Sequence, residues 1–111
     1  MSGPPPSAQF IYDALRKVAV ACGTDAAGQL WTLEFRARHD DDSMSVMVRE
    51  PDGTERTLTL TDDDFVFDEH HVSLRPAPET TLTMPPLYLK KLRGFTRGNV
   101  PTPDIPGPSL P

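Results

Sequence analysis

The chain has 111 residues, of which 37 % are apolar and 13 are proline, and its formal net charge is −5. This length suits one domain with a modest hydrophobic core. The single cysteine, Cys22, excludes an intramolecular disulfide, and no apolar run approaches the roughly 20 residues of a transmembrane helix. We therefore expect a protein of a reducing compartment, either cytoplasmic or in a virion assembled in a cytoplasm, with no signal peptide and no membrane partner.

The first 22 residues predict an arm followed by a helix. Residues 1–6 (MSGPPP) favour an extended arm, because proline fixes φ and lacks an N–H donor. Ser7 is a suitable N-cap and Gly23 a suitable helix end. Between them, apolar residues recur at helical spacing: Phe10, Ile11, Ala14, Leu15, Val18 and Cys22. This stripe predicts an amphipathic helix over about residues 8–22.

The middle of the chain has the period-two pattern of an antiparallel meander. The stretch LWTLEFRAR predicts a strand over residues 30–38, and MSVMVR predicts the next one over 44–49. The turn EPDG (50–53) follows, with proline at its second position and glycine where φ is positive. A third strand is expected at about 54–61. A fourth and a fifth are indicated by Phe65, Phe67, Val72 and Leu74.

The C-terminal part predicts one more short strand, a helix and a tail. Residues 79–84 suit a short edge strand, and Pro85-Pro86 followed by LYLKKLRGF predicts a helix of about two turns. The expected fold is α+β, with the N-terminal amphipathic helix packed on an antiparallel meander of four to five strands, a short C-terminal helix and Pro-rich extended arms at both ends. Residues 7–98 would form a single domain, and 99–111 a Pro-rich tail.

The stretch DDDFVFDEHH (62–71) concentrates carboxylates and histidines, the usual ligands of metal ions. In an extended chain, however, His70 and His71 point to opposite faces, and no calcium-loop or zinc spacing is present. A site of His39, His70 and His71 is conceivable but follows no recognised motif. We expect solvated turns, with no metal, no cofactor and no catalytic residue. The acidic surface would comprise Asp40, Asp41, Asp42, Asp62, Asp63 and Asp64.

Charge is distributed unevenly along the chain. Residues 39–69 contain eleven acidic and two basic residues, whereas 85–111 contain four basic residues and one acidic residue. The basic segment suits a solvated helix face, a surface that docks on the acidic turns of a neighbouring copy in an assembly, or contacts to nucleic acid phosphates. The overall acidity of the chain disfavours nucleic acid as its main partner. The expected partner-binding residues are Lys90, Lys91, Arg93, Phe95 and Arg97, together with the PxxP prolines Pro103 and Pro106.

These observations predict a non-catalytic protein-interaction module. It would be an accessory or structural subunit of a homo- or hetero-oligomeric assembly, with a virion or phage particle as one setting. One alternative is an acidic inhibitor of the immunity or antitoxin kind, whose aspartate turns face a basic target. Another is a small metal-dependent enzyme that uses His39, His70 and His71.

Overall fold

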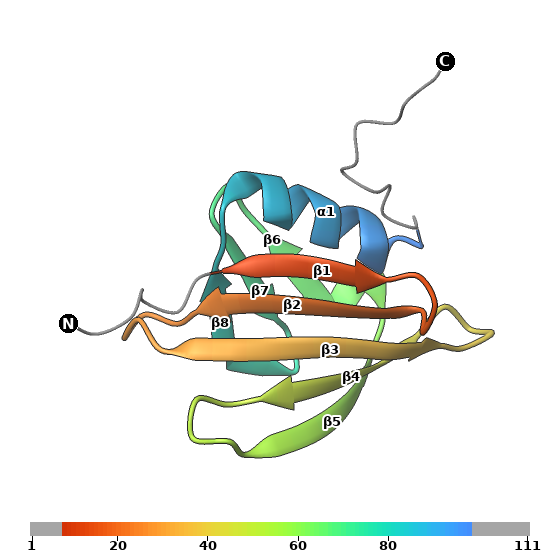
Figure 1. Ribbon diagram of the computed structural model, residues 1–111, viewed down its shortest axis with the longest axis horizontal. Helices are drawn as coiled ribbons and strands as arrows, with labels where there is room; N and C mark the ends of the chain where they lie inside the picture. Colours follow the sequence, from red (N-terminus) through yellow and green to blue (C-terminus); the bar gives the residue numbers. More distant parts are fainter. Residues whose placement is uncertain (1–7, 99–111) are drawn as a thin grey trace.

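The computed structural model describes residues 8–98, which form eight β-strands and one C-terminal α-helix (Figure 1). The strands pair antiparallel in the order β5-β4-β3-β2-β8-β7-β6, and β1 also pairs with β2. The elements are β1 (Gln9–Asp13), β2 (Val18–Thr24), β3 (Leu30–Arg38), β4 (Met44–Arg49), β5 (Glu55–Leu60), the 3-10 turn η1 (Asp62–Asp64), β6 (Phe65–Phe67), β7 (His71–Leu74), β8 (Ala77–Thr83) and α1 (Pro86–Thr96).

The predicted α+β fold with an N-terminal helix is wrong, because the chain folds mostly as antiparallel sheet. Residues 9–24 form the hairpin β1–β2, in which Phe10 faces Ala21 and Tyr12 faces Ala19. The small alanines leave room for the aromatic rings above them. Leu15, which the helical stripe would bury, is 97 % exposed in the hairpin turn. Carboxylate atom Oδ1 of Asp13 accepts backbone hydrogen bonds from Leu15 and Arg16, which fixes that turn.

The strand positions predicted for the middle of the chain are confirmed, but the single meander is wrong, because β5 and β6 lie at opposite ends of the strand order. β3, β4, β5, β6 and β7 lie where the alternation placed them, and the glycine of the turn between β4 and β5 has a φ of +92°. The predicted edge strand at 79–84 is wrong in one respect. It is β8, which lies between β2 and β7 and not at an edge. The C-terminal helix is confirmed, and at 11 residues it is longer than expected.

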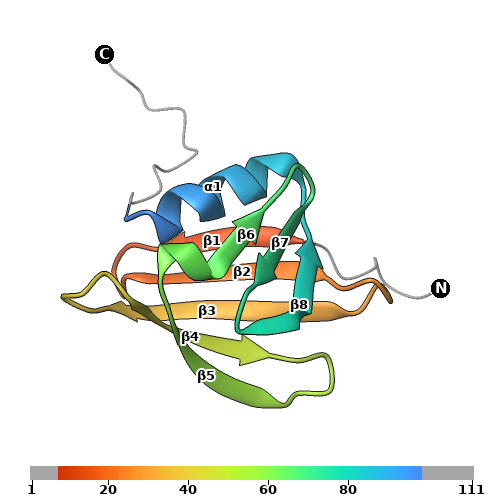
Figure 2. The same ribbon diagram turned by 180° about the vertical axis from the view of Figure 1, so that it is seen from behind.

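The strands form two layers. β1–β5 make one layer, and β6–β8 cross its inner face together with α1 (Figure 2). The layers join where β2 pairs with β8, through the single pair Thr24–Thr83. Gly23 permits this approach, since a Cβ at its position would lie only 2.8 Å from Cβ of Leu82. The inner face is therefore covered by strands and the C-terminal helix instead of the predicted N-terminal helix.

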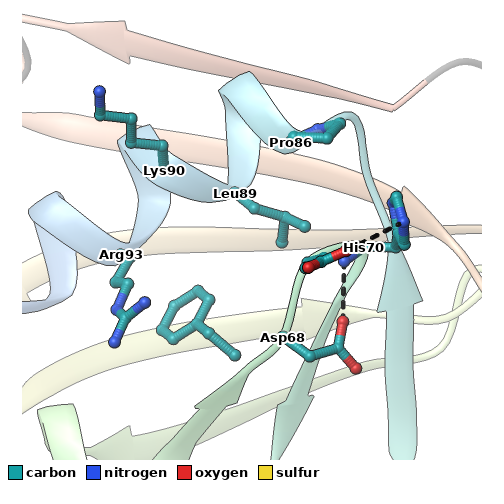
Figure 3. A pocket seen from close by; sticks show the side chains of 8 residues that line it. Asp68, His70, Pro86, Leu89, Lys90 and Arg93 are labelled. Atoms are coloured by element: carbon teal, nitrogen blue, oxygen red, sulfur yellow. Dashed lines mark hydrogen bonds and ion pairs between the residues drawn. The ribbon is translucent and has the colours of Figure 1, made fainter.

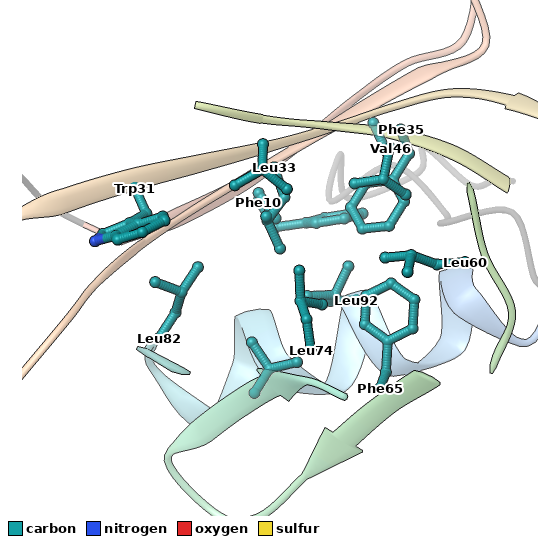
Figure 4. Close-up of a cluster of buried hydrophobic side chains, with 14 of the residues drawn as sticks. Phe10, Trp31, Leu33, Phe35, Val46, Leu60, Phe65, Leu74, Leu82 and Leu92 are labelled. Atoms are coloured by element: carbon teal, nitrogen blue, oxygen red, sulfur yellow. The ribbon is translucent and has the colours of Figure 1, made fainter. Parts of the chain in front are cut away.

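The core lies between these layers (Figure 4). Leu33, Phe35 and Val46 from the first layer face Leu82 and Leu92 from the second, and all five are almost completely buried. Burying a side chain of this size contributes about 1.5–3 kcal/mol. The core thus holds α1 and the β6–β7 turn, between residues 68 and 70, at fixed positions on the sheet.

Candidate functional site

Helix α1 presents a row of basic side chains to solvent. Pro86 occupies the first helical turn, and beyond the helix Gly98, with φ +95°, donates its N–H to the carbonyl of Phe95. Leu89 and Leu92 anchor the inner face in the core. Lys90, Arg93 and Arg97 are exposed on the outer side. We call these three residues the basic ridge.

A groove of about 330 Å³ separates α1 from the β6–β7 turn (Figure 3). Leu89 and Phe67 give it an apolar floor, and Figure 3 shows Leu89 directed from α1 toward the turn. The guanidinium carbon of Arg93 lies 5.9 Å from the centre of the Phe67 ring, which is within cation–π range. The far rim consists of Asp68, Glu69 and His70. We call this hollow the helix groove.

The rim of the helix groove is a tightly hydrogen-bonded turn. Oδ1 of Asp68 accepts the backbone N–H groups of His70 at 2.8 Å and His71 at 2.7 Å. The hydrogen bond from the His70 N–H is the main cause that lowers the pKa of Asp68, because it favours the charged carboxylate. The Asp68 carboxylate thus stabilises the turn through these hydrogen bonds. The neighbouring Glu69 side chain is exposed.

The three histidines do not converge. His71 of β7 pairs with Thr83 of β8, and Thr83 pairs with Thr24 of β2. Thr24 also pairs with Leu30, the first residue of β3, so His71 lies toward the start of β3. His39 follows the last residue of β3 and bonds through Nε2 to the Ser45 hydroxyl at 3.0 Å. The nine residues of β3 therefore separate His39 from the other two. Within residues 8–98 no group of three metal-ligating side chains is close enough to hold an ion.

The two acidic triplets, by contrast, lie close together. Asp41 and Asp42 from the β3–β4 loop and Asp62 and Asp63 from η1 line a single crevice of about 610 Å³. The crevice also contains two guanidinium groups, those of Arg38 and Arg97. Its charge is therefore mixed, and the polarisation along the sequence is partly cancelled in space.

Most of these carboxylates already bind within the fold. Asp41 accepts the Ser43 hydroxyl at 2.6 Å, which lowers the pKa of Asp41. Asp64 accepts the N–H of Thr61 at 2.9 Å in a capping box. Asp62 accepts the hydroxyl of Thr96 at 3.3 Å and so ties η1 to α1. These contacts give Asp41, Asp62 and Asp64 a structural role, although every aspartate of the two triplets except the half-buried Asp64 is exposed.

The predicted partner-binding residues fall in different places. Lys90 and Arg93 line the helix groove and Arg97 lines the mixed-charge crevice, whereas Lys91 is half-buried. Phe95 packs inward, with its ring centre 5.4 Å from that of Phe35 and 5.8 Å from that of Tyr12. Pro103 and Pro106 lie outside the described residues.

The sequence analysis missed a third hollow, of about 500 Å³, at the other end of α1. Its charged lining is entirely basic and comprises Arg16, Lys17, Arg36 and Arg38, and its aromatic lining comprises Tyr12, Phe35 and Phe95. We call this hollow the basic pocket. In the segment RAR at 36–38, the alternation places Arg36 and Arg38 on the same face of β3, and this is a sequence signal for two of the cations in the basic pocket. Arg16 and Lys17 were not predicted as site residues, because the hairpin turn was interpreted as part of a helix.

The chain matches no protein family, no curated protein and no solved structure at a significant level. Among residues 8–98, no helix has the length and apolar character needed to cross a membrane. Proposals about function therefore depend on the three hollows and the charges around them.

Proposed function

We propose that this protein is a non-catalytic interaction module that binds another protein subunit through the helix groove and the basic ridge. The single observation that carries the proposal is that Lys90 and Arg93 border an apolar-floored groove without an acidic partner. None of the ion pairs among residues 8–98 includes either side chain. Unpaired cations beside a hydrophobic cleft suit an acidic segment that carries one apolar side chain.

The expected partner presents a Leu-, Met- or Phe-like residue flanked by carboxylates. The apolar side chain would displace water from Phe67 and Leu89, and the carboxylates would pair with Lys90 and Arg93. Leu87, which is 57 % exposed on the same helix, extends the contact surface. The exposed Glu69 on the far rim would orient the partner, because it repels an acid placed on that side.

The compartment proposed with this function is a reducing one, since Cys22 is a buried free thiol. A virion setting is dropped, because neither the fold nor the comparisons support it. The polyanion-mimic alternative is weakened by the internal hydrogen bonds of Asp41, Asp62 and Asp64. The metal-enzyme alternative is weakened by the separation of His39 from His70 and His71.

The test compares Arg93→Glu with Arg75→Glu, two exposed arginines that undergo the same change of charge. Arg75 lies in the β7–β8 turn, at the end of β7 opposite the helix groove. The immobilised native protein and each variant are used to capture proteins from the source cells. Each captured protein is then purified, and its affinity for the native protein and for both variants is measured by direct titration. The proposal expects a partner whose affinity falls at least about tenfold with Arg93→Glu and is unchanged with Arg75→Glu.

Three results would count against this function. The first is a partner set that both variants retain in full. The second is a set that both lose equally, since that would indicate a general charge effect. The third is tight binding of a single-stranded oligonucleotide that depends on Arg93, which would assign the ridge to nucleic acid instead.

A further inference from the structure

The basic pocket is built from segments far apart in the sequence. The β1–β2 turn supplies Arg16 and Lys17, the end of β3 supplies Arg36 and Arg38, and α1 supplies Phe95. Figure 1 shows this turn, this strand end and the C-terminal end of α1 at the same side of the molecule. No carboxylate is among the described residues that line the pocket, although the chain as a whole is acidic.

The arginine pairings leave donors available. Arg16 approaches Asp13 through Nε at 3.6 Å, and Arg36 bonds to Glu34 through Nε at 2.6 Å. The hydrogen bond from Arg36 to Glu34 uses Nε, and a guanidinium has five N–H donors, so its terminal nitrogens can donate to a ligand. Terminal guanidinium nitrogens bind phosphate oxygens through charge-assisted hydrogen bonds.

Arg38 has a different role from the other cations. Its Nη2 donates to the carbonyls of Phe95 at 3.0 Å and Thr96 at 3.3 Å in the last turn of α1, and the Phe95 carbonyl also accepts the N–H of Gly98. It therefore positions the helix end, and with it the Phe95 ring, against β3. We assign Arg38 as a positioning residue and not as a ligand contact.

Lys17 provides an independent observation. Its φ is +57°, in the left-handed region that glycine adopts without cost and that a lysine side chain disfavours. No ion pair among residues 8–98 includes Lys17, and its side chain is exposed at the pocket rim. A strained backbone at a cleft is a reason to look for function there. At this position Lys17 is one of the residues that line the basic pocket, together with Tyr12 and Phe95.

We propose that the basic pocket binds a small phosphorylated compound with an aromatic ring, of the class of nucleoside phosphates. The phosphate would contact Lys17, Arg16 and Arg36, and the ring would pack on the half-buried faces of Tyr12 and Phe95. A volume of about 500 Å³ is within the usual range for small-ligand sites. This site is separate from the helix groove, so it does not depend on the proposed function.

The experiment measures adenosine monophosphate, adenosine and inorganic phosphate by calorimetry on the full chain, with NMR shifts of the Tyr12 and Phe95 rings as a second readout. The monophosphate should bind at least tenfold more tightly than either fragment and should shift both rings. Three results would overturn the proposal: no binding of the monophosphate, equal affinity for inorganic phosphate, or equal affinity for adenosine. Shifts confined to other residues would overturn it as well.

Two glycine variants separate ligand binding from folding. Lys17→Gly removes the charge and also the backbone strain, so its melting temperature should be unchanged or higher while its affinity falls roughly tenfold. Arg75→Gly is the charge control, because Arg75 is an exposed cation in the β7–β8 turn and does not line the pocket. It should retain full affinity. Undiminished binding by Lys17→Gly, or an equal loss in both variants, would refute the assignment.

Discussion

Replacing Gly23 by alanine tests the junction that joins the two layers of the fold. The added Cβ would lie 2.8 Å from Cβ of Leu82, 3.1 Å from the carbonyl oxygen of Thr83 and 3.2 Å from Cγ of Met84. Ordinary contacts of a Cβ begin near 3.4 Å, so β8 would have to move by about 0.6 Å. Because β2 and β8 share only the pair Thr24–Thr83, few hydrogen bonds resist that movement, but the core beneath β8 does.

The size of the effect follows from two opposed contributions. Overpacking a core costs about 1–3 kcal/mol. Alanine is favoured over glycine within a strand by about 0.5–1 kcal/mol, because it has less conformational entropy to lose. We therefore expect Gly23→Ala to destabilise the protein by about 0.5–2 kcal/mol. With a urea m-value of roughly 1–3 kcal/mol/M, the unfolding midpoint should fall by about 0.2–2 M.

The assay is urea unfolding followed by Trp31 fluorescence, together with amide hydrogen exchange at Thr83. Gly28→Ala is the control, because Gly28 has a φ of +80° and open space around its Cβ position. Its cost should come from backbone strain alone, and exchange at Thr83 should not change. If Gly23→Ala were as stable as the native chain and Thr83 exchanged no faster, the close approach of β8 to β2 would be wrong.

The remaining predictions concern the core, the hairpin turn and one acidic group. Leu33→Ala should cost about 2–5 kcal/mol in thermal unfolding, because Leu33 is fully buried in the core. Leu15→Ser should change stability by less than about 0.5 kcal/mol, since Leu15 is a solvent-exposed turn residue; a large loss would favour the helix instead. The Trp31 indole N–H donates to Oδ2 of Asp25 at 2.7 Å, and this hydrogen bond is the main reason why the pKa of Asp25 is lowered. Trp31→Phe should therefore raise the pKa of Asp25 toward 3.8, which an NMR titration would measure. The pKa of Asp25 is lower in the folded protein than in the unfolded chain, so the Asp25 carboxylate contributes stability above pH 3.8. This stability should be lost as the pH falls through the folded pKa, and the loss should be smaller in Trp31→Phe.

The two kinds of binding proposed here use opposite ends of α1. The helix groove lies beside the β6–β7 turn near its start, and the basic pocket lies near its end. Both hollows depend on how the core seats the helix on the sheet. Arg38 holds one end of α1 through its last carbonyls, and the Thr96 hydroxyl bonds Asp62 of η1 at that same end.

The sequence by itself determined the elements whose signals are local. β3 and β4 alternate apolar and polar side chains, EPDG has the residues that its turn requires, and α1 begins at a proline and is closed by Gly98. These signals act within a few residues, so they do not depend on the rest of the fold. The C-terminal helix and the positions of strands β3 to β7 were predicted for that reason.

Tertiary structure decided what local signals left open. Residues 9–24 have apolar side chains at helical spacing, but they also have aromatic residues that fit over Ala19 and Ala21 once β1 pairs with β2. Pairing on both sides of β2 satisfies that strand's backbone groups and buries its alanines, and a helix could not make those contacts. The basic pocket likewise exists only because the sheet brings the β1–β2 turn, the end of β3 and the end of α1 together. Contacts between residues distant in the chain are set by how the layers close, and residue spacing alone does not encode that closure.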